Sequence, residues 1–91
     1  MITLRDVTLT VTNEVGLHAR PAALFVKAAS RYPDTRVEII KDGTAQNAKS
    51  ILGVLTLQVT QGTTILVRAD GPHAEDVLSA LQSLVARDFG G

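Results

Sequence analysis

The hydrophobic period changes repeatedly along this 91-residue chain, and this pattern restricts the fold more than any other feature of the sequence. Alternating apolar residues are typical of half-buried strands, whereas apolar residues at i, i+3, i+4 and i+7 are typical of amphipathic helices. The expected elements are a strand at 2–12, a helix at 18–31, strands at 35–41 and 44–48, a helix at 49–57, a strand around 65–69 and a helix at 72–88.

The extended segments have the alternation expected of a sheet with one buried face. Val7, Leu9 and Val11 alternate with threonines, so the threonines would face water on the other side. Asp42-Gly43 is a strong tight-turn dipeptide between two strands. The order β-α-β-β-α-β-α therefore predicts an α+β protein, in which helices pack on one face of an antiparallel sheet.

The two longer helices carry continuous apolar stripes. The stripe of the first consists of Ala22, Phe25, Val26 and Ala29, and Pro21 near its start is tolerated because the first N–H groups of a helix are unpaired anyway. The last helix has the cleanest stripe in the chain, made of Ala74, Val77, Leu78, Leu81, Leu84 and Val85.

The composition excludes several classes of function. The chain has no cysteine, so thiolate metal sites are impossible, and two distant histidines make a poor metal centre. Nine basic residues balance nine acidic ones and aromatic residues make up 3%, which argues against nucleic-acid binding. No stretch approaches the roughly 20 apolar residues that cross a bilayer. We expect one cytoplasmic domain over residues 1–91, without metal, cofactor or membrane insertion.

The stretch Gly16-Leu17-His18-Ala19-Arg20-Pro21 places a histidine between a glycine turn and the start of a helix. The first N–H groups of a helix attract anions and disfavour a protonated imidazole. A neutral imidazole is a nucleophile that can carry a phosphoryl group. The amides of Ala19 and Arg20, together with the Arg20 guanidinium, would then bind phosphoryl oxygens. The structural alternative is a helix-capping histidine beside a surface arginine.

Ser50 and the short helix after it form a second distinctive stretch. Ser50 is expected to be the N-cap of this helix, where a phosphate on its hydroxyl would be tolerated and would add nearly two negative charges. A helix this short cannot bury all of its apolar side chains against one sheet, although complete burial remains the structural alternative. We expect Val54 and Leu57 in the core and an exposed docking patch of Ile51, Leu52 and Leu55.

Two motifs in the chain resemble those of one family. The stretch from Gly16 to Ala22 resembles the active-site motif of HPr, the histidine-containing phosphocarrier of the bacterial sugar phosphotransferase system. Residues 47–55, Asn47-Ala48-Lys49-Ser50-Ile51-Leu52-Gly53-Val54-Leu55, resemble the family's regulatory-serine signature. The resemblance covers essentially the whole chain in length and element order. Val15 departs from the pattern, because many relatives carry a small or polar residue there, and we expect only a change in local loop packing.

The resemblance implies a fold and a set of roles. The implied fold is an open-faced β-sandwich, with a four-stranded antiparallel sheet and three helices on one face. Members of the family accept a phosphoryl group from phosphorylated enzyme I and pass it to IIA domains. The resemblance implies that His18 is the phosphohistidine through its Nδ1, that Arg20 supports the phosphate and that Ser50 is the regulatory phosphoserine. The implied docking residues are Leu17, Ala19, Ile51, Leu52 and Leu55.

The sequence is compatible with two functions. The first is a monomeric phosphoryl carrier for sugar permeases. The second is a regulatory HPr-like binding module of a partial phosphotransferase system, which would act on a transcription regulator or an enzyme. In either case the resemblance implies an HPr kinase/phosphorylase as the enzyme that would modify Ser50. An RNA-binding module with a similar element order would need strand aromatics and a basic face, which the sequence lacks.

Overall fold

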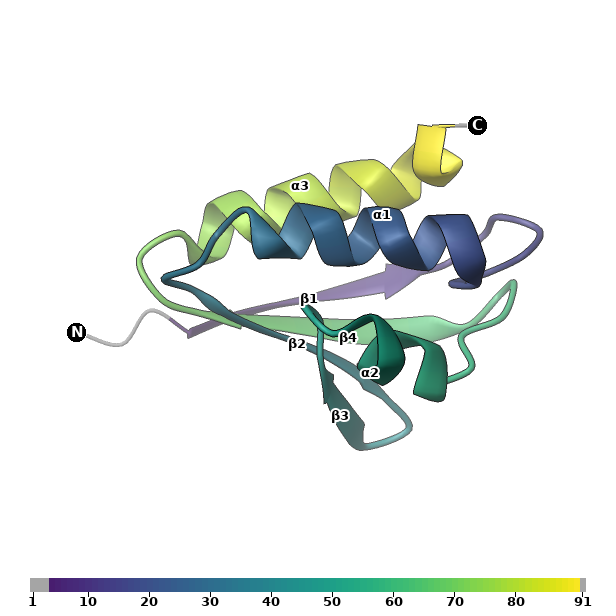
Figure 1. Cartoon of the computed structure of the whole chain (residues 1–91), viewed down its shortest axis with the longest axis horizontal. Helices are drawn as coiled ribbons and strands as arrows, with labels where there is room; N and C mark the ends of the chain where they lie inside the picture. The colour runs from purple at the N-terminus through teal and green to yellow at the C-terminus, as the bar shows by residue number, and fades with distance from the viewer. Residues whose placement is uncertain (1–3, 91) are drawn as a thin grey trace.

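The helices and strands follow the predicted order (Figure 1). The structure is a computed structural model that describes residues 4–90, so the first two residues of the predicted strand 2–12 lie outside the described residues. The elements are β1 (Leu4–Thr10), α1 (Ala19–Ser30), β2 (Arg36–Lys41), β3 (Thr44–Asn47), α2 (Ile51–Thr56), β4 (Thr64–Asp70) and α3 (Ala74–Ala86), followed by a short 3-10 turn at Asp88–Gly90.

The sheet is antiparallel throughout, with its four strands in the order β1-β4-β2-β3. The register places Val7 opposite Val67, and Val67 in turn opposite Ile39. Val67 and Ile39 are fully buried beneath the helices, because α1 and α3 lie over this face of the sheet (Figure 1). The predicted α+β fold, an open-faced β-sandwich with three helices, is confirmed.

The opposite face of the sheet carries polar side chains, as the alternation predicts. Thr8 and Thr10 are exposed, and the Thr10 hydroxyl lies 3.0 Å from that of Thr64 on the neighbouring strand. Arg68 donates hydrogen bonds of 2.9 and 3.3 Å to the two carboxylate oxygens of Asp6. These hydrogen bonds are the main reason that the pKa of Asp6 lies below its usual value. Such an exposed pair helps to fix strand register but adds little stability.

The helices bury the predicted stripes. Ala22, Phe25 and Ala29 of α1 are fully buried, whereas Val26 is only partly covered. In α3 all of the predicted stripe is buried except Leu84, which is half-buried. No helix within residues 4–90 combines the length and the apolar character that crossing a membrane requires.

The C-terminal end of the last predicted helix differs from the expectation. α3 ends at Ala86, and Asp88 and Phe89 adopt left-handed backbone angles with φ of 49° and 59°. This turn points the Phe89 ring back into the core, where it is 1% exposed. The apolar period could not reveal this burial, because the ring reaches the core through a turn and not through a helical stripe.

A substitution at Leu81 tests how much the packing of α3 contributes to the stability of the core. Its side chain is fully buried, so Leu81→Ala leaves a cavity and is expected to lower the free energy of unfolding by about 2–5 kcal/mol. Urea denaturation followed by circular dichroism measures this change, with Gln82→Ala on the exposed side of the same helix as the matched control. A loss below about 1 kcal/mol would contradict the packing described for Leu81.

Candidate functional site

His18 is the N-cap residue of α1, and its side chain is exposed. Its backbone is extended, with φ of −114° and ψ of 157°, and its ring makes no capping hydrogen bond. Within residues 4–90 the imidazole has no hydrogen-bond or ion-pair partner. An imidazole ring therefore faces solvent at the positive end of a 12-residue helix, at the position that the sequence predicts.

Two backbone N–H groups beside His18 are free within the described part of the chain, those of Ala19 and Arg20. Pro21 has no N–H, and the amide of Ala22 already donates to the His18 carbonyl at 3.3 Å. Ala19 has φ of 31°, a left-handed value that residues other than glycine rarely adopt. The site thus combines two free donors with local backbone strain, and such strain is frequent at functional sites.

The loop before His18 is anchored by buried contacts. Leu17 is 2% exposed, and its amide donates to the Val59 carbonyl at 2.9 Å. Gly16 has φ of 63°, and a Cβ atom there would collide with the same carbonyl, so glycine is required. The predicted docking role of Leu17 is wrong for its side chain, because that side chain packs in the core and offers no surface to a partner.

Arg20 is exposed and is held loosely by the C-terminal turn. Its Nη1 donates to the Phe89 carbonyl at 3.5 Å, which is long for a hydrogen bond. The turn itself is tied to the loop after β1, because the Thr12 hydroxyl donates to the Asp88 carboxylate at 3.0 Å. These contacts join residues that are far apart in the sequence, so no local pattern could have predicted them.

Ser50 caps α2, as predicted, and accepts a hydrogen bond of 3.1 Å from the Gly53 amide on its Oγ. The three residues of the α2 patch, Ile51, Leu52 and Leu55, differ in solvent exposure. Ile51 is 40% exposed and Leu52 is 75% exposed, whereas Leu55 is half-buried and contributes only part of its surface. The expectation for the inner face of α2 is confirmed, because Val54 and Leu57 are buried in the core.

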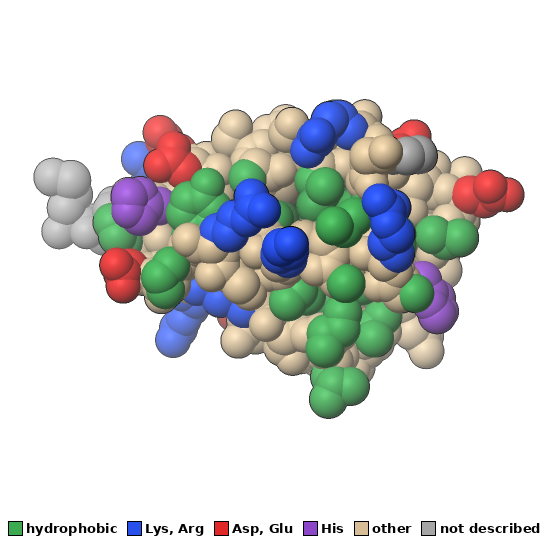
Figure 2. All heavy atoms as spheres, turned by 45° about the horizontal axis from the view of Figure 1, so that its top comes forward, with side chains coloured by type: hydrophobic (Ala, Val, Ile, Leu, Met, Phe, Trp, Pro, Cys, Tyr) green, Lys and Arg blue, Asp and Glu red, His purple; other side chains and the backbone are tan. Residues whose placement is uncertain are grey.

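The His18 loop and the α2 patch lie on one face of the molecule. Figure 2 shows apolar side chains gathered along the lower middle of the view, next to the histidine at its right-hand end, and α1 contacts α2 directly. Val15, which is 60% exposed, lines a shallow hollow with His18 and Arg20. We expected valine at position 15 to change only the packing of the loop. Its side chain also adds apolar surface beside the His18 imidazole.

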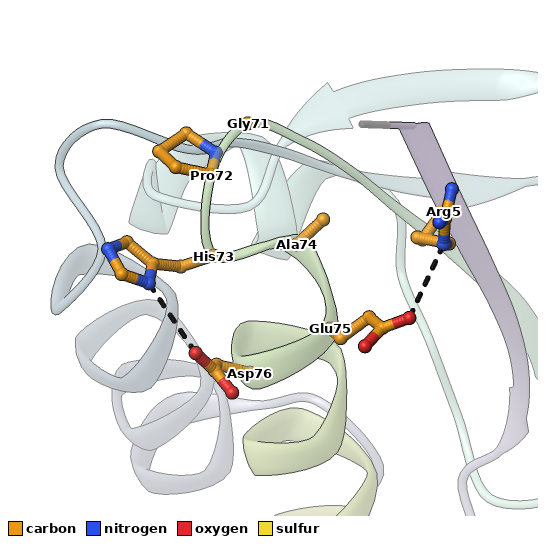
Figure 3. A pocket seen from close by; sticks show the side chains of 7 residues that line it. All are labelled: Arg5, Gly71, Pro72, His73, Ala74, Glu75 and Asp76. Carbon is orange, nitrogen blue, oxygen red and sulfur yellow. Dashed lines mark ion pairs between the residues drawn. The ribbon is translucent and has the colours of Figure 1, made fainter. Parts of the chain in front are cut away.

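His73, the other histidine, has different surroundings at the N-terminus of α3 (Figure 3). Its Nδ1 lies 3.4 Å from a carboxylate oxygen of Asp76, and Glu75 beside it pairs with Arg5 at 3.5 Å. The two carboxylates make this end of the molecule unfavourable for a phosphoryl anion. Nowhere in residues 4–90 do three His, Asp or Glu side chains gather as a metal ion would require.

The fold and the site define a small α+β protein that presents an exposed histidine at a helix N-terminus, beside an apolar patch. Residues 6–87 match the family model described as the PTS HPr component phosphorylation site. The chain is 40% identical over 82 residues to the phosphocarrier protein HPr of Treponema pallidum, which is 90% of this chain and 92% of that protein. The chain belongs to the HPr family, the phosphocarrier proteins of the phosphotransferase system.

Two further relatives extend this comparison. The crystal structure of HPr from Thermoanaerobacter tengcongensis superposes with a TM-score of 0.93 at 41% identity and covers 96% of this chain and 97% of its own. The HPr-like protein Crh of Halalkalibacterium halodurans is 39% identical over 75 residues, which is 82% of this chain and 88% of Crh. The fold is thus shared with both HPr and HPr-like proteins.

Proposed function

We propose that the protein is a phosphoryl carrier, in which His18 accepts a phosphoryl group from phosphorylated enzyme I and passes it to IIA domains of sugar permeases. The observation that carries this proposal is the exposed imidazole of His18 at the N-terminus of α1, which has no partner among residues 4–90. A lone pair on a ring nitrogen, Nδ1 by analogy with the family, attacks the phosphorus atom. The bond between phosphorus and the donor breaks as the new bond to His18 forms.

The surroundings of His18 suit an anion that must be held briefly. The free amides of Ala19 and Arg20 and the positive end of α1 stabilise a phosphoryl group, while solvent access keeps this stabilisation partial. Arg20 would exchange its long hydrogen bond to the Phe89 carbonyl for bonds to phosphoryl oxygens. Charge-assisted bonds are stronger than bonds to a neutral carbonyl, so this exchange is favourable.

Arg20→Lys tests the role of the guanidinium. Lysine keeps the charge but loses the forked donor geometry, so phosphoryl transfer from enzyme I is expected to slow by about tenfold without stopping. Rapid-quench measurement with labelled phosphoenolpyruvate gives the rate, and Lys27→Met on the same helix serves as a charge-loss control. Transfer at the wild-type rate would contradict a role for the guanidinium in phosphate support.

We propose that partners dock on Ala19 and the α2 patch, close to the phosphoryl group. Ala19 is exposed, and Ile51 and Leu52 give the α2 patch its exposed surface. Proteins that meet only for a single phosphoryl transfer need only small interfaces. A phosphate placed on Ser50 by an HPr kinase/phosphorylase would lie beside Ile51 at the start of α2. It would oppose docking through its desolvation cost and through repulsion from the phosphoryl group that a partner carries.

The second candidate is a regulatory module that acts on a transcription regulator or an enzyme in place of sugar uptake. Similarity to an HPr-like protein, Crh, favours this candidate. In either role we propose that residues 1–91 act as one domain in the cytoplasm, and that the protein is a monomer. A crystal structure of an HPr dimer exists for the Thermoanaerobacter tengcongensis relative, so light scattering of this protein decides its oligomeric state.

A chase experiment separates the two candidates. The protein is first labelled with phosphoenolpyruvate and enzyme I, and purified IIA domains are then added in excess. The carrier role predicts that the label leaves the protein and appears on a IIA domain. A label that forms but moves to none of the IIA domains would favour the regulatory role, whereas a folded protein that takes no label would refute the carrier proposal.

A further inference from the structure

Lys41 occupies an unusual place for a lysine. It is the last residue of β2, and alternation along the strand puts it on the same side as the buried Val37 and Ile39. This side faces the helices, where a charge is costly unless it is paired with hydrogen-bond acceptors. Lys41 is half-buried, and its ammonium group reaches such acceptors at the end of α2.

The Lys41 ammonium binds backbone carbonyl groups just after the C-terminal end of α2. Its Nζ donates to the Leu57 carbonyl at 2.9 Å and to the Gln58 carbonyl at 3.0 Å. The last carbonyls of a helix lack internal partners, and a cation at this end also interacts favourably with the helix dipole. Gln58 has φ of 53°, so the helix ends here in a left-handed residue. The hydrogen bonds of Lys41 thus fix the position of the backbone at Leu57 and Gln58, where the chain changes direction after α2.

This anchor matters because α2 is short and adjoins the His18 loop. α2 has six residues, and a helix of this length depends on contacts at its ends and on packing. Ser50 caps its first turn, while Lys41 holds its exit. The next residue in the chain, Val59, accepts the amide of Leu17, which directly precedes His18. The α2 patch and His18 are therefore connected through the segment that Lys41 holds.

We propose that Lys41 is a positioning residue that fixes the α2 patch relative to His18. The role rests on the proposed function, because it presumes that partners dock on this patch. Lys41 lies at the far end of α2 from Ser50 and acts through its two hydrogen bonds to the chain after α2. Loss of these bonds would leave the chemistry at His18 intact but would weaken partner docking.

The test compares Lys41→Met, which keeps an apolar stem, with Lys41→Arg, which restores donors for carbonyl oxygens. As substrates of phosphorylated enzyme I, Lys41→Met is expected to show a KM raised about fivefold with kcat changed less than about twofold. Lys41→Arg is expected to recover at least half of this loss. Arg36→Met removes one positive charge from the exposed face of the same strand and should leave KM unchanged.

Hydrogen exchange provides a readout that does not depend on phosphoryl transfer. The amides of Leu57 and Gln58 donate to Val54 and Leu55 carbonyls, and in Lys41→Met their protection is expected to fall about fivefold while that of β4 stays unchanged. Faster exchange with an unchanged KM would make Lys41 a structural cap only and would overturn the proposal. An equal rise of KM in Arg36→Met, or no recovery in Lys41→Arg, would overturn it as well.

Failure of the proposed function and failure of the inference about Lys41 would give different results. If wild type itself takes no phosphoryl group from enzyme I, the proposed function fails, and the docking role of Lys41 fails with it. If wild type is phosphorylated normally and Lys41→Met has the same KM, only the inference about Lys41 fails. Circular dichroism on each variant confirms that the comparison is made between folded proteins.

Discussion

His18→Ala is expected to accept no acid-labile phosphate from phosphoenolpyruvate and enzyme I while remaining folded. The substitution removes the imidazole proposed to form the bond to phosphorus, so the loss of acid-labile phosphate should be complete. The ring is exposed and makes no capping hydrogen bond, so the free energy of unfolding should change by less than about 0.5 kcal/mol. Labelling with phosphoenolpyruvate and urea denaturation of the same preparation measure the two effects.

His73→Ala is the matched control for this result. His73 is also an exposed N-cap residue without a side-chain capping bond, but it starts a different helix, α3, and its Nδ1 lies 3.4 Å from an Asp76 carboxylate oxygen. His73→Ala should therefore be labelled at the wild-type rate. Retained labelling in His18→Ala would contradict the assignment of the phosphoryl site, as would loss of labelling in a folded His73→Ala.

Ser50→Asp is expected to lower kcat/KM for phosphorylation by enzyme I by about tenfold or more, an effect second only to that of His18→Ala. Aspartate is as good an N-cap as serine, so the bond from the Gly53 amide can be kept and α2 should stay folded. Its charge, however, lies next to Ile51 and near the 75% exposed Leu52, where a partner must displace water. Steady-state labelling kinetics at several protein concentrations give kcat/KM.

Ser50→Ala separates the effect of charge from the effect of capping. Alanine loses the bond from Gly53 and should lower the free energy of unfolding by about 0.5–2 kcal/mol, but it adds no charge. We expect Ser50→Ala to be less stable than Ser50→Asp but to be phosphorylated faster. The reverse order, or equal rates for wild type and Ser50→Asp, would show that a charge at this position does not control docking.

The fold was predictable because local patterns and tertiary packing agree in most of the chain. The alternation of Val7 and Leu9 with threonines matches a sheet that is covered on one face and open on the other. Asp42-Gly43 forms the expected turn, with positive φ at both residues. The stripe of α3 is buried as its spacing predicts. Helix ends were less predictable, since α3 begins and ends two residues inside the expected range 72–88.

The sequence also indicated the backbone geometry of the proposed phosphoryl site. A histidine directly before a helix that contains an early proline marks a place where backbone donors are unpaired, and the free amides of Ala19 and Arg20 bear this out. The capping role of Ser50 followed from similar reasoning about the next helix. Both inferences succeed because capping depends on residues that are close in sequence.

Features that depend on long-range packing could not be predicted in this way. Leu17 looks like a surface residue next to His18, but the loop turns its side chain into the core. Contacts between Arg20 and Phe89, and between Lys41 and the end of α2, join segments that only the folded chain brings together. A periodic pattern reports which face of an element is apolar, but it does not report which distant backbone group a polar side chain reaches.

The most direct test of the account is the chemical identity of the label on the wild-type protein after reaction with phosphoenolpyruvate and enzyme I. We expect one phosphoryl group per chain, labile in acid and stable in base, on the peptide that contains His18. This result would establish a phosphohistidine at the N-terminus of α1. A folded wild-type protein that takes no label, or an acid-stable label on Ser50 or another hydroxyl residue, would contradict the central claim.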